Sequence, residues 1–413
     1  DLLSPAVDAL FLYCDVRGAL RAGLDLFAAV ATELSAALEA AASVQPILRE
    51  LWGRSIARVG AVEVLSSNYA RGEKYLLDCQ PYVQADKERA FVLAYLGQAA
   101  AESGELALAR TRLEESVAIS RQCNDFAGLA HALQVLEVGR PFVEAQRLAA
   151  ESLACARTAG RPDLIASRLN QFGWHTWCLG DYATADAYWR EGIGLGEQLG
   201  LRGENAWPLD CLGLAAWFQG DMETAERNIG EALAIYSEGG RPFAIGMCKA
   251  ELAMVLASTR RCPEAIAMAR EAVAITRGVN VQMMLIISLS HLGTVLGASG
   301  EFEEARETLH EAVRRAWDSQ FFFSLMMAFY AYAELLVLES RSVGPPGSPG
   351  HLTTAATLLS CVCIQPAAWQ AYKEKAAHLL TRIEPAVPAA VFSAALQAGR
   401  SMTIEELVNT LLA

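Results

Sequence analysis

A polar residue followed by a small residue and an aliphatic one recurs along this chain at a nearly constant interval. The steps between successive copies are 36, 40, 40, 40 and 40 residues. Such an interval is typical of one helical unit copied in tandem, each copy burying its apolar face on its neighbours. The pattern predicts a helical solenoid rather than a closed globule. The copies are Glu115-Ser116-Val117, Glu151-Ser152-Leu153, Glu191-Gly192-Ile193, Glu231-Ala232-Leu233, Glu271-Ala272-Val273 and Glu311-Ala312-Val313.

Small residues form a second series in the same register. Each follows a turn signal, and in most copies another small residue lies twelve positions earlier. Antiparallel helices approach closely only where side chains are minimal, because the ridges of one then enter the grooves of the other. We therefore expect each copy to be a pair of antiparallel helices. The later series is Ala109, Ala145, Ala185, Ala225, Ala265 and Ala305, and the earlier one is Gly97, Gly173, Gly213, Ala253 and Gly293.

This arrangement resembles the tetratricopeptide repeat family. The small residues of its two helices match Gly173 and Ala185, and an aromatic position of its second helix matches Trp189. The interval here is longer than the usual 34 residues of that family, which we attribute to longer helices. The resemblance implies an all-α fold, a right-handed superhelical solenoid of tetratricopeptide-like helix pairs with a period of about 40 residues.

The register also suggests where the repeats begin and end. We expect a degenerate helical cap over residues 1–52, the repeat array over 53–340, a Pro/Gly-rich mobile linker over 341–350 that is not helical, and a C-terminal helical cap over 351–413. Helices are predicted at about 352–363, 367–382 and 389–398, and a last one starts at Ile404. Thr403 and Glu406 have the spacing of a capping box for it.

The end of the chain carries a second resemblance. Residues 395–407 read ALQAGRSMTIEEL, similar to the phrase that closes the tetratricopeptide arms of bacterial STAND-type signal-transduction ATPases and multidomain transcriptional regulators. Met402, Thr403 and Ile404 depart mildly from it. The resemblance implies a sensor arm, here a C-terminal fragment starting at Asp1, whose partner is an ATPase or effector module of the same full-length protein. A phosphate-binding loop is not found in the sequence itself.

Composition narrows the function classes. Hydrophobic residues make up 53% of the chain, and the formal charge is −13, which argues against direct nucleic-acid binding by this segment. The ten cysteines show no zinc spacing and mostly lie in apolar stretches, so we expect a reducing, cytoplasmic setting. The apolar run 321–338 is long enough to test as a membrane span. It contains Glu334 and keeps the repeat register, so we interpret it as a buried repeat helix and expect no membrane contact.

Catalytic chemistry is not evident in the sequence. The histidines show no paired metal-ligand spacing, and His131 and His291 occupy the same place in two repeats, which favours a packing role. His175 lies between Trp174 and Trp177. A nucleophile, a base and an orienting group that would converge are not apparent. We therefore predict that the chain is not an enzyme and has no metal, cofactor or catalytic residue.

The expected binding site comes from the family geometry. In tetratricopeptide repeats the first helix lines the concave groove, and this places four tryptophans and a phenylalanine of two adjacent repeats on one patch, as an interface or ligand pocket would have them. An alternative is that the tryptophans fill the space between paired helices, with Asn170 and Asp210 satisfying their N–H groups. The candidates are Asn170, Trp174, Trp177, Trp207, Asp210, Leu214, Trp217 and Phe218.

Two functions remain open from the sequence. The first is a sensor that binds a peptide, protein or small molecule in the concave groove and relays occupancy to the ATPase or effector module. The second is a general protein-interaction scaffold that uses the same groove for a peptide or a subunit. A closed pocket favours the sensor, whereas an open trough favours the scaffold.

Overall fold

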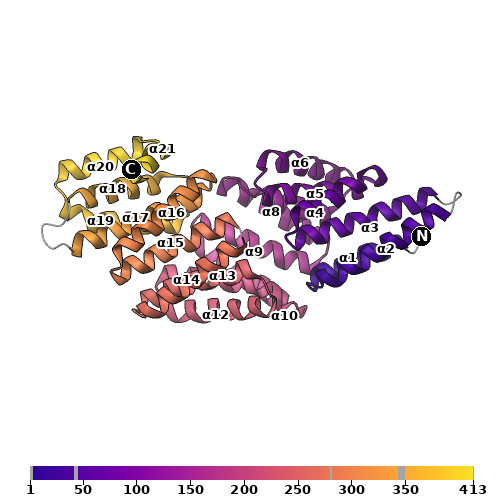
Figure 1. Cartoon of the computed structure of the whole chain (residues 1–413), viewed down its shortest axis with the longest axis horizontal. Helices are drawn as coiled ribbons and strands as arrows, with labels where there is room; N and C mark the ends of the chain where they lie inside the picture. Colours follow the sequence, from indigo (N-terminus) through magenta and orange to yellow (C-terminus); the bar gives the residue numbers. More distant parts are fainter. Residues whose placement is uncertain (1–2, 41–44, 280, 343–348, 413) are drawn as a thin grey trace. The chain divides into compact units, whose positions relative to one another are not determined.

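The structure, a computed structural model, describes residues 3–40, 45–279, 281–342 and 349–412. Over these residues the chain forms α-helices and short 3-10 helices without a strand, which confirms the predicted all-α repeat fold (Figure 1). The backbone divides into two compact units: unit 1 comprises residues 1–175 and 194–201, and unit 2 comprises 176–193 and 202–413. The predicted division into caps and array remains a prediction.

Unit 1 is built from helices that pair in sequence order. Among its described residues, one buried apolar cluster contains Phe27, Leu76 and Leu96, and another contains Leu113 and Leu133. The helices are α1 (Leu3–Val16), α2 (Leu20–Ala40), α3 (Gln45–Leu65), α4 (Tyr69–Cys79), η1 (Gln80–Tyr82), α5 (Asp86–Glu102), α6 (Leu106–Gln122), α7 (Phe126–Leu136), α8 (Phe142–Thr158) and most of α9 (Pro162–Cys178), with the end of α10 (Tyr182–Gln198).

Unit 2 continues with four helix pairs and a C-terminal group. In a pair such as α13 and α14, the first helix is buried along most of its length, and the second buries one face, which includes Ala265, Ala269 and Ala272. Its further helices are η2 (Arg202–Asn205), α11 (Ala206–Gln219), α12 (Met222–Glu238), α13 (Pro242–Ser258), α14 (Cys262–Val279), α15 (Gln282–Ser299), α16 (Phe302–Asp318), α17 (Phe322–Ser342), α18 (Pro349–Ile364), α19 (Gln370–Ile383), η3 (Glu384–Ala386), α20 (Ala389–Ser401) and α21 (Ile404–Leu412).

The series of small residues marks the closest contacts within the pairs. A Cβ atom added to Gly213 of α11 would lie 3.0 Å from the backbone nitrogen of Ile229 and 3.2 Å from the carbonyl oxygen of Ala225, both in α12. At such distances a larger side chain would force the two backbones apart. The predicted seam between paired helices is therefore confirmed at this pair.

The turns within the pairs follow the sequence signals. Gly220 ends α11 in the left-handed region, and the Asp221 side chain then accepts a hydrogen bond from the Thr224 backbone N–H, which caps α12. At the corresponding turn after α13, Arg260 takes a φ of 61° although it has a Cβ atom. The geometry of the turn is thus kept where glycine is missing.

The C-terminal helices agree closely with the predicted ones, and the capping box at Thr403 is confirmed: its backbone N–H donates to Glu406 Oε2 at 2.8 Å, and the Glu406 N–H donates back to Thr403 Oγ1 at 3.2 Å. The expectation that 341–350 is not helical is wrong at both ends, because α17 continues through Ser342 and α18 starts at Pro349. Residues 343–348 lie outside the described residues.

Two helices of the described residues, α15 and α17, are long and apolar enough to cross a membrane by length and composition. Of their most apolar windows, 67% and 78% respectively are buried inside the protein. Both supply the first helix of a pair, so their apolar surface packs against neighbouring helices. The apolar run 321–338 is therefore found as a buried repeat helix.

Candidate functional site

Three of the eight predicted site residues meet in unit 2. Trp177 lies in the last turn of α9, and Trp217 and Phe218 lie near the end of α11. The ring of Phe218 contacts both tryptophans, with centroid distances of 5.2 Å to Trp177 and 4.8 Å to Trp217. These edge-on contacts are favourable aromatic geometries. Tyr330 of α17 lines one pocket with Trp217 and another with Trp177 and Phe218. We call these four side chains the aromatic wall: Trp177, Trp217, Phe218 and Tyr330.

The aromatic wall is covered by α19, a helix outside the repeat pattern that predicts the groove. Trp369, at the N-cap of α19, has its ring 5.5 Å from Trp177. One turn later the Tyr372 ring lies 5.3 Å from Phe218 and 5.3 Å from Tyr330. A segment nearly two hundred residues away in the chain thus occupies the face on which we expected a ligand. Trp177 is only 1% exposed in consequence.

Lys375 lies on the same side of α19 as Trp369 and Tyr372. Its Nζ atom lies 3.5 Å from the centroid of the Trp217 ring and 4.7 Å from that of Phe218, which is the geometry of a cation–π contact. Burial lowers the pKa of Lys375 to about 8, and the nearby carboxylate of Glu334 partly offsets this effect. The ammonium is thus held against aromatic rings at a site where charge is less favourable than in water.

Two polar contacts fix the arrangement around the aromatic wall. The hydroxyl of Tyr182 donates to Glu374 Oε2 of α19 at 2.8 Å, which ties the start of α10 to this helix. The indole N–H of Trp217 donates to the Ser258 hydroxyl of α13 at 3.0 Å, and that hydroxyl donates to the Met254 carbonyl. The indole is therefore satisfied inside unit 2, as buried tryptophan N–H groups require.

Space remains on both sides of α19. One cavity of about 260 Å³ lies beside Trp217 and reaches Ser258, Ser290 and His291. Another of about 450 Å³ lies beside Trp177 and Phe218. Three side chains line both cavities: Tyr330, Glu334 and Lys375. The face of unit 2 that carries the aromatic wall is thus only partly filled by α19.

Asp210 is buried near this face rather than exposed to it, with 3% of its surface accessible. Burial raises its pKa to about 6, and its hydrogen bond with Glu251 of α13 works in the opposite direction. Burial and the negative charge of Asp210 raise the pKa of Glu251 well above its usual range. The Cys248 thiol donates to Asp210 at 3.4 Å. Because two adjacent buried carboxyl groups cannot both ionise at low cost, this pair holds a proton and joins α11 to α13.

The remaining predicted residues are divided between the units. Asn170, 3% exposed, and the partly buried Trp174 lie in unit 1, whereas Trp207 and Leu214 lie in unit 2 with the aromatic wall. Trp207 is partly buried and Leu214 is 8% exposed. The prediction that all eight form one ligand-binding patch stays a prediction. Repeat geometry could not identify α19, although Trp369, Tyr372 and Lys375 have the spacing of one helix face.

The histidines of the repeats are packing residues. His131 and His291 are buried, which lowers their pKa values to about 3 and about 4. His175 lies 3.3 Å from a carboxylate oxygen of the buried Glu137 in unit 1. Within the described ranges no group of three or more His, Cys, Asp or Glu side chains is placed to hold a metal ion.

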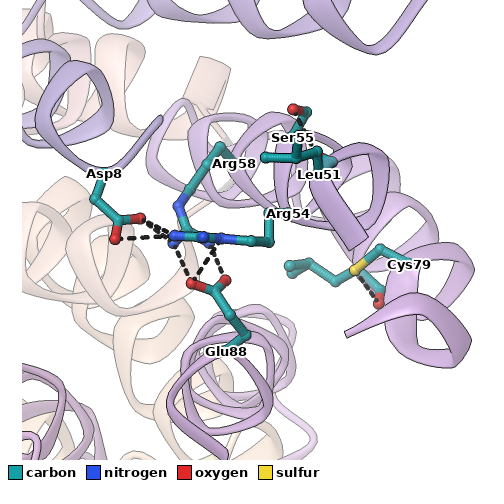
Figure 2. A network of polar contacts seen from close by, with 8 residues as sticks. Asp8, Leu51, Arg54, Ser55, Arg58, Cys79 and Glu88 are labelled. Carbon is teal, nitrogen blue, oxygen red and sulfur yellow. Dashed lines mark hydrogen bonds and ion pairs between the residues drawn. The ribbon is translucent and has the colours of Figure 1, made fainter. Parts of the chain in front are cut away.

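Unit 1 contains a different polar cluster, shown in Figure 2. Arg58 of α3 binds Glu88 of α5 through Nη1 at 2.8 Å and Asp8 of α1 through Nη2 at 2.7 Å. Arg54 binds the same two carboxylates. The Arg58 guanidinium also lies 3.8 Å from the centroid of the Phe91 ring. These paired charges attach α1 to α3 and α5, so we assign the cluster a structural role.

The tetratricopeptide repeat family model matches residues 246–280 and 285–316, most of α13 to α16. No curated protein sequence matches the chain. Solved structures similar to it include a Rap protein complexed with Competence and Sporulation Factor (TM-score 0.53, 13% identity, 87% of this chain and 99% of that one). Others are the apo quorum sensor NprR from B. thuringiensis (0.54, 12%, 83% and 99%) and aspartyl phosphate phosphatase F from Bacillus subtilis (0.53, 12%, 67% and 73%). At these identities the likeness shows the fold alone, which is that of a tetratricopeptide-like helical repeat protein.

Proposed function

We propose that this chain is a non-catalytic sensing domain that binds a peptide or protein segment at the aromatic wall of unit 2 and relays occupancy to an ATPase or effector module of the same full-length protein. One observation carries the proposal: a helix already occupies this wall through two aromatic rings and a lysine, with cavities beside it. Rigid aromatic anchors next to a few charged groups are the usual composition of an interface hot spot.

Two similar structures agree with a sensing role. One is a Rap protein complexed with Competence and Sporulation Factor, and another is a quorum sensor, NprR. The relay rests on the tail phrase around Gly399 and Arg400, which resembles the end of signal-transduction ATPase arms. In such a relay the ligand acts by binding one arrangement of the arm more tightly than another.

The alternative is an interaction scaffold without any relay. The occupied aromatic wall supports the scaffold and the sensor equally, because both would bind a protein segment there. It differs in that binding at the aromatic wall would leave an attached effector unchanged. A small-molecule ligand, which the sequence left open, is less favoured because α19 separates the free space into two cavities.

Binding can be tested with a displayed library of random peptides selected on the full chain. Selected peptides should lose affinity by about tenfold or more in the double variant Trp217→Leu/Phe218→Ala, because both rings belong to the wall. The matched control is Phe243→Ala, an aromatic of unit 2 that is 40% exposed and does not line either cavity. A library that gives no binder, or binders unaffected by the double variant while circular dichroism shows an intact fold, would overturn the proposal.

A further inference from the structure

We propose that the aromatic wall recognises a partner helix with Trp, Tyr and Lys at three-residue spacing, and that α19 occupies the wall as an internal competitor for that partner. The inference rests on the function proposed above and adds to it the class of partner and its regulation. Three features of α19 carry it: the register of its contacts, the incomplete filling of the face, and the tether that holds it there.

The register of the contacts defines what the wall can recognise. Trp369, Tyr372 and Lys375 follow one another at intervals of three and therefore lie on one side of the helix. All three contact the wall, at Trp177, Phe218 and Trp217 respectively. On the other side Ala377 and Thr381 are exposed. Helices recognised in grooves present anchors at such positions, so the observed contacts describe a peptide-binding mode.

The fit between α19 and the face is incomplete. Two pockets of about 260 and 450 Å³ that open to solvent adjoin this helix, so the face beside it is only partly covered. Glu334 and the Lys375 head lie between these cavities. A partner helix with bulkier side chains beside the same three anchors would fill this space, and it could therefore replace α19 on the wall.

The tether explains how the wall is regulated. Residues 365–369 connect α18 to α19, and α19 packs against α18. A segment held by a short connection acts at a local concentration in the millimolar range. A partner then binds with an apparent affinity reduced by the fraction of molecules in which α19 has left the wall. The internal helix thus sets the threshold at which a partner is sensed.

The experiment uses a fluorescein-labelled synthetic peptide of residues 366–385, titrated against the full chain and two variants. Lys375→Glu places a carboxylate over aromatic rings and next to Glu334, and Trp369→Ala removes the first anchor. The peptide should bind both variants on the order of tenfold more tightly than the wild-type chain, because the internal competitor is weakened. Ala377→Glu, on the exposed side of α19, should bind it as the wild type does. A peptide carrying the same Lys375→Glu change should not bind.

Hydrogen exchange of the α19 amides decides between the remaining outcomes. If exchange shows that α19 has opened in either variant and the peptide still does not bind, the wall does not recognise such helices and the inference fails. If α19 stays equally protected in both variants, the Trp369 and Lys375 contacts do not hold it, which also overturns the inference. In either case peptides from the random library can still bind the aromatic wall. The proposed function is therefore decided by the library selection and not by this experiment.

Discussion

Two helices, α1 in unit 1 and α19 in unit 2, are attached to the repeats with different shares of polar and aromatic contacts. α1 is held by Asp8, which accepts hydrogen bonds from Arg54 and Arg58 within a network that includes the buried Glu88. α19 is held by ring contacts and by a lysine over aromatic faces. α1 also buries Phe11, whose ring lies 5.3 Å from Phe91 and 6.0 Å from Tyr95. Its attachment thus adds a network of paired charges to aromatic contacts, whereas the contacts of α19 with the aromatic wall are mainly aromatic.

The two attachments differ in whether their partner can be exchanged. Buried arginines that lose a carboxylate are left with uncompensated charge, so a network of this kind tolerates no substitute. The contacts of α19 can be made by a second helix that presents the same anchors, because dispersion and the hydrophobic effect do not require a covalently fixed partner. We therefore regard α1 as a permanent part of unit 1 and α19 as a replaceable part of unit 2.

The largest effect is expected from Glu88→Gln. The substitution keeps the shape of the side chain but leaves Arg54 and Arg58 with one carboxylate, so the free energy of unfolding should fall by about 3 kcal/mol. Urea denaturation measures this change in the free energy of unfolding, and hydrogen exchange of the α3 and α5 amides shows whether the loss lies at the network. Asp86→Asn, which removes an exposed partner of Arg89 on the same helix, should cost no more than about 1 kcal/mol. Equal losses in the two variants would show that the network is no stronger than a surface pair.

The second prediction concerns the pH dependence of α19 docking in unit 2. The pKa of Lys375 is about 8 when α19 is docked and close to the ordinary 10.5 when it is free. The free helix therefore binds more protons between these values, so docking becomes more favourable as pH rises. From pH 7 to pH 9 the protection factors of the α19 amides should increase by roughly tenfold.

Three neighbouring groups keep one charge state in this pH range. Burial raises the pKa values of Tyr330 and Tyr372, which stay protonated, and His291, with a pKa of about 4, stays neutral. Lys375→Met is the matched control because it keeps a similar stem and cannot titrate. An increase of the same size in this variant would mean that another group, and not Lys375, links docking to pH.

The same contrast explains what the sequence could predict. The helix pairs follow from contacts within about forty residues, such as Gly213 against Ala225, and similar close approaches recur at Gly97 and Gly293. The docking of α19 joins Tyr182 to Glu374 across 192 residues, and it occurs once. A repeat pattern cannot predict a contact that occurs only once.

The candidate site was therefore only partly predictable. Repeat geometry placed Trp177, Trp217 and Phe218 on one face, where they do meet, because neighbouring copies stack in register. It also placed Asn170 and Trp174 with them; these two lie in unit 1, and their part in the site stays a prediction. The division into two units falls within α9 and α10, whose helical pattern continues without interruption. A pattern of local periodicity does not reveal which copies form a common core.

The smallest effect is expected from Tyr182→Phe, which tests whether α19 docks by shape or by direction. The variant keeps the ring near Trp177 and removes the hydroxyl that donates to Glu374. Because Glu374 is exposed, water replaces most of this bond, and the protection of α19 should fall by only about threefold, the equivalent of a weak hydrogen bond. Hydrogen exchange measures it beside Trp369→Ala, for which we expect a loss on the order of tenfold or more. If Tyr182→Phe releases α19 as fully as Trp369→Ala does, the directional hydrogen bond to Glu374 holds α19 in place. A partner helix could then replace α19 only by forming the same hydrogen bond.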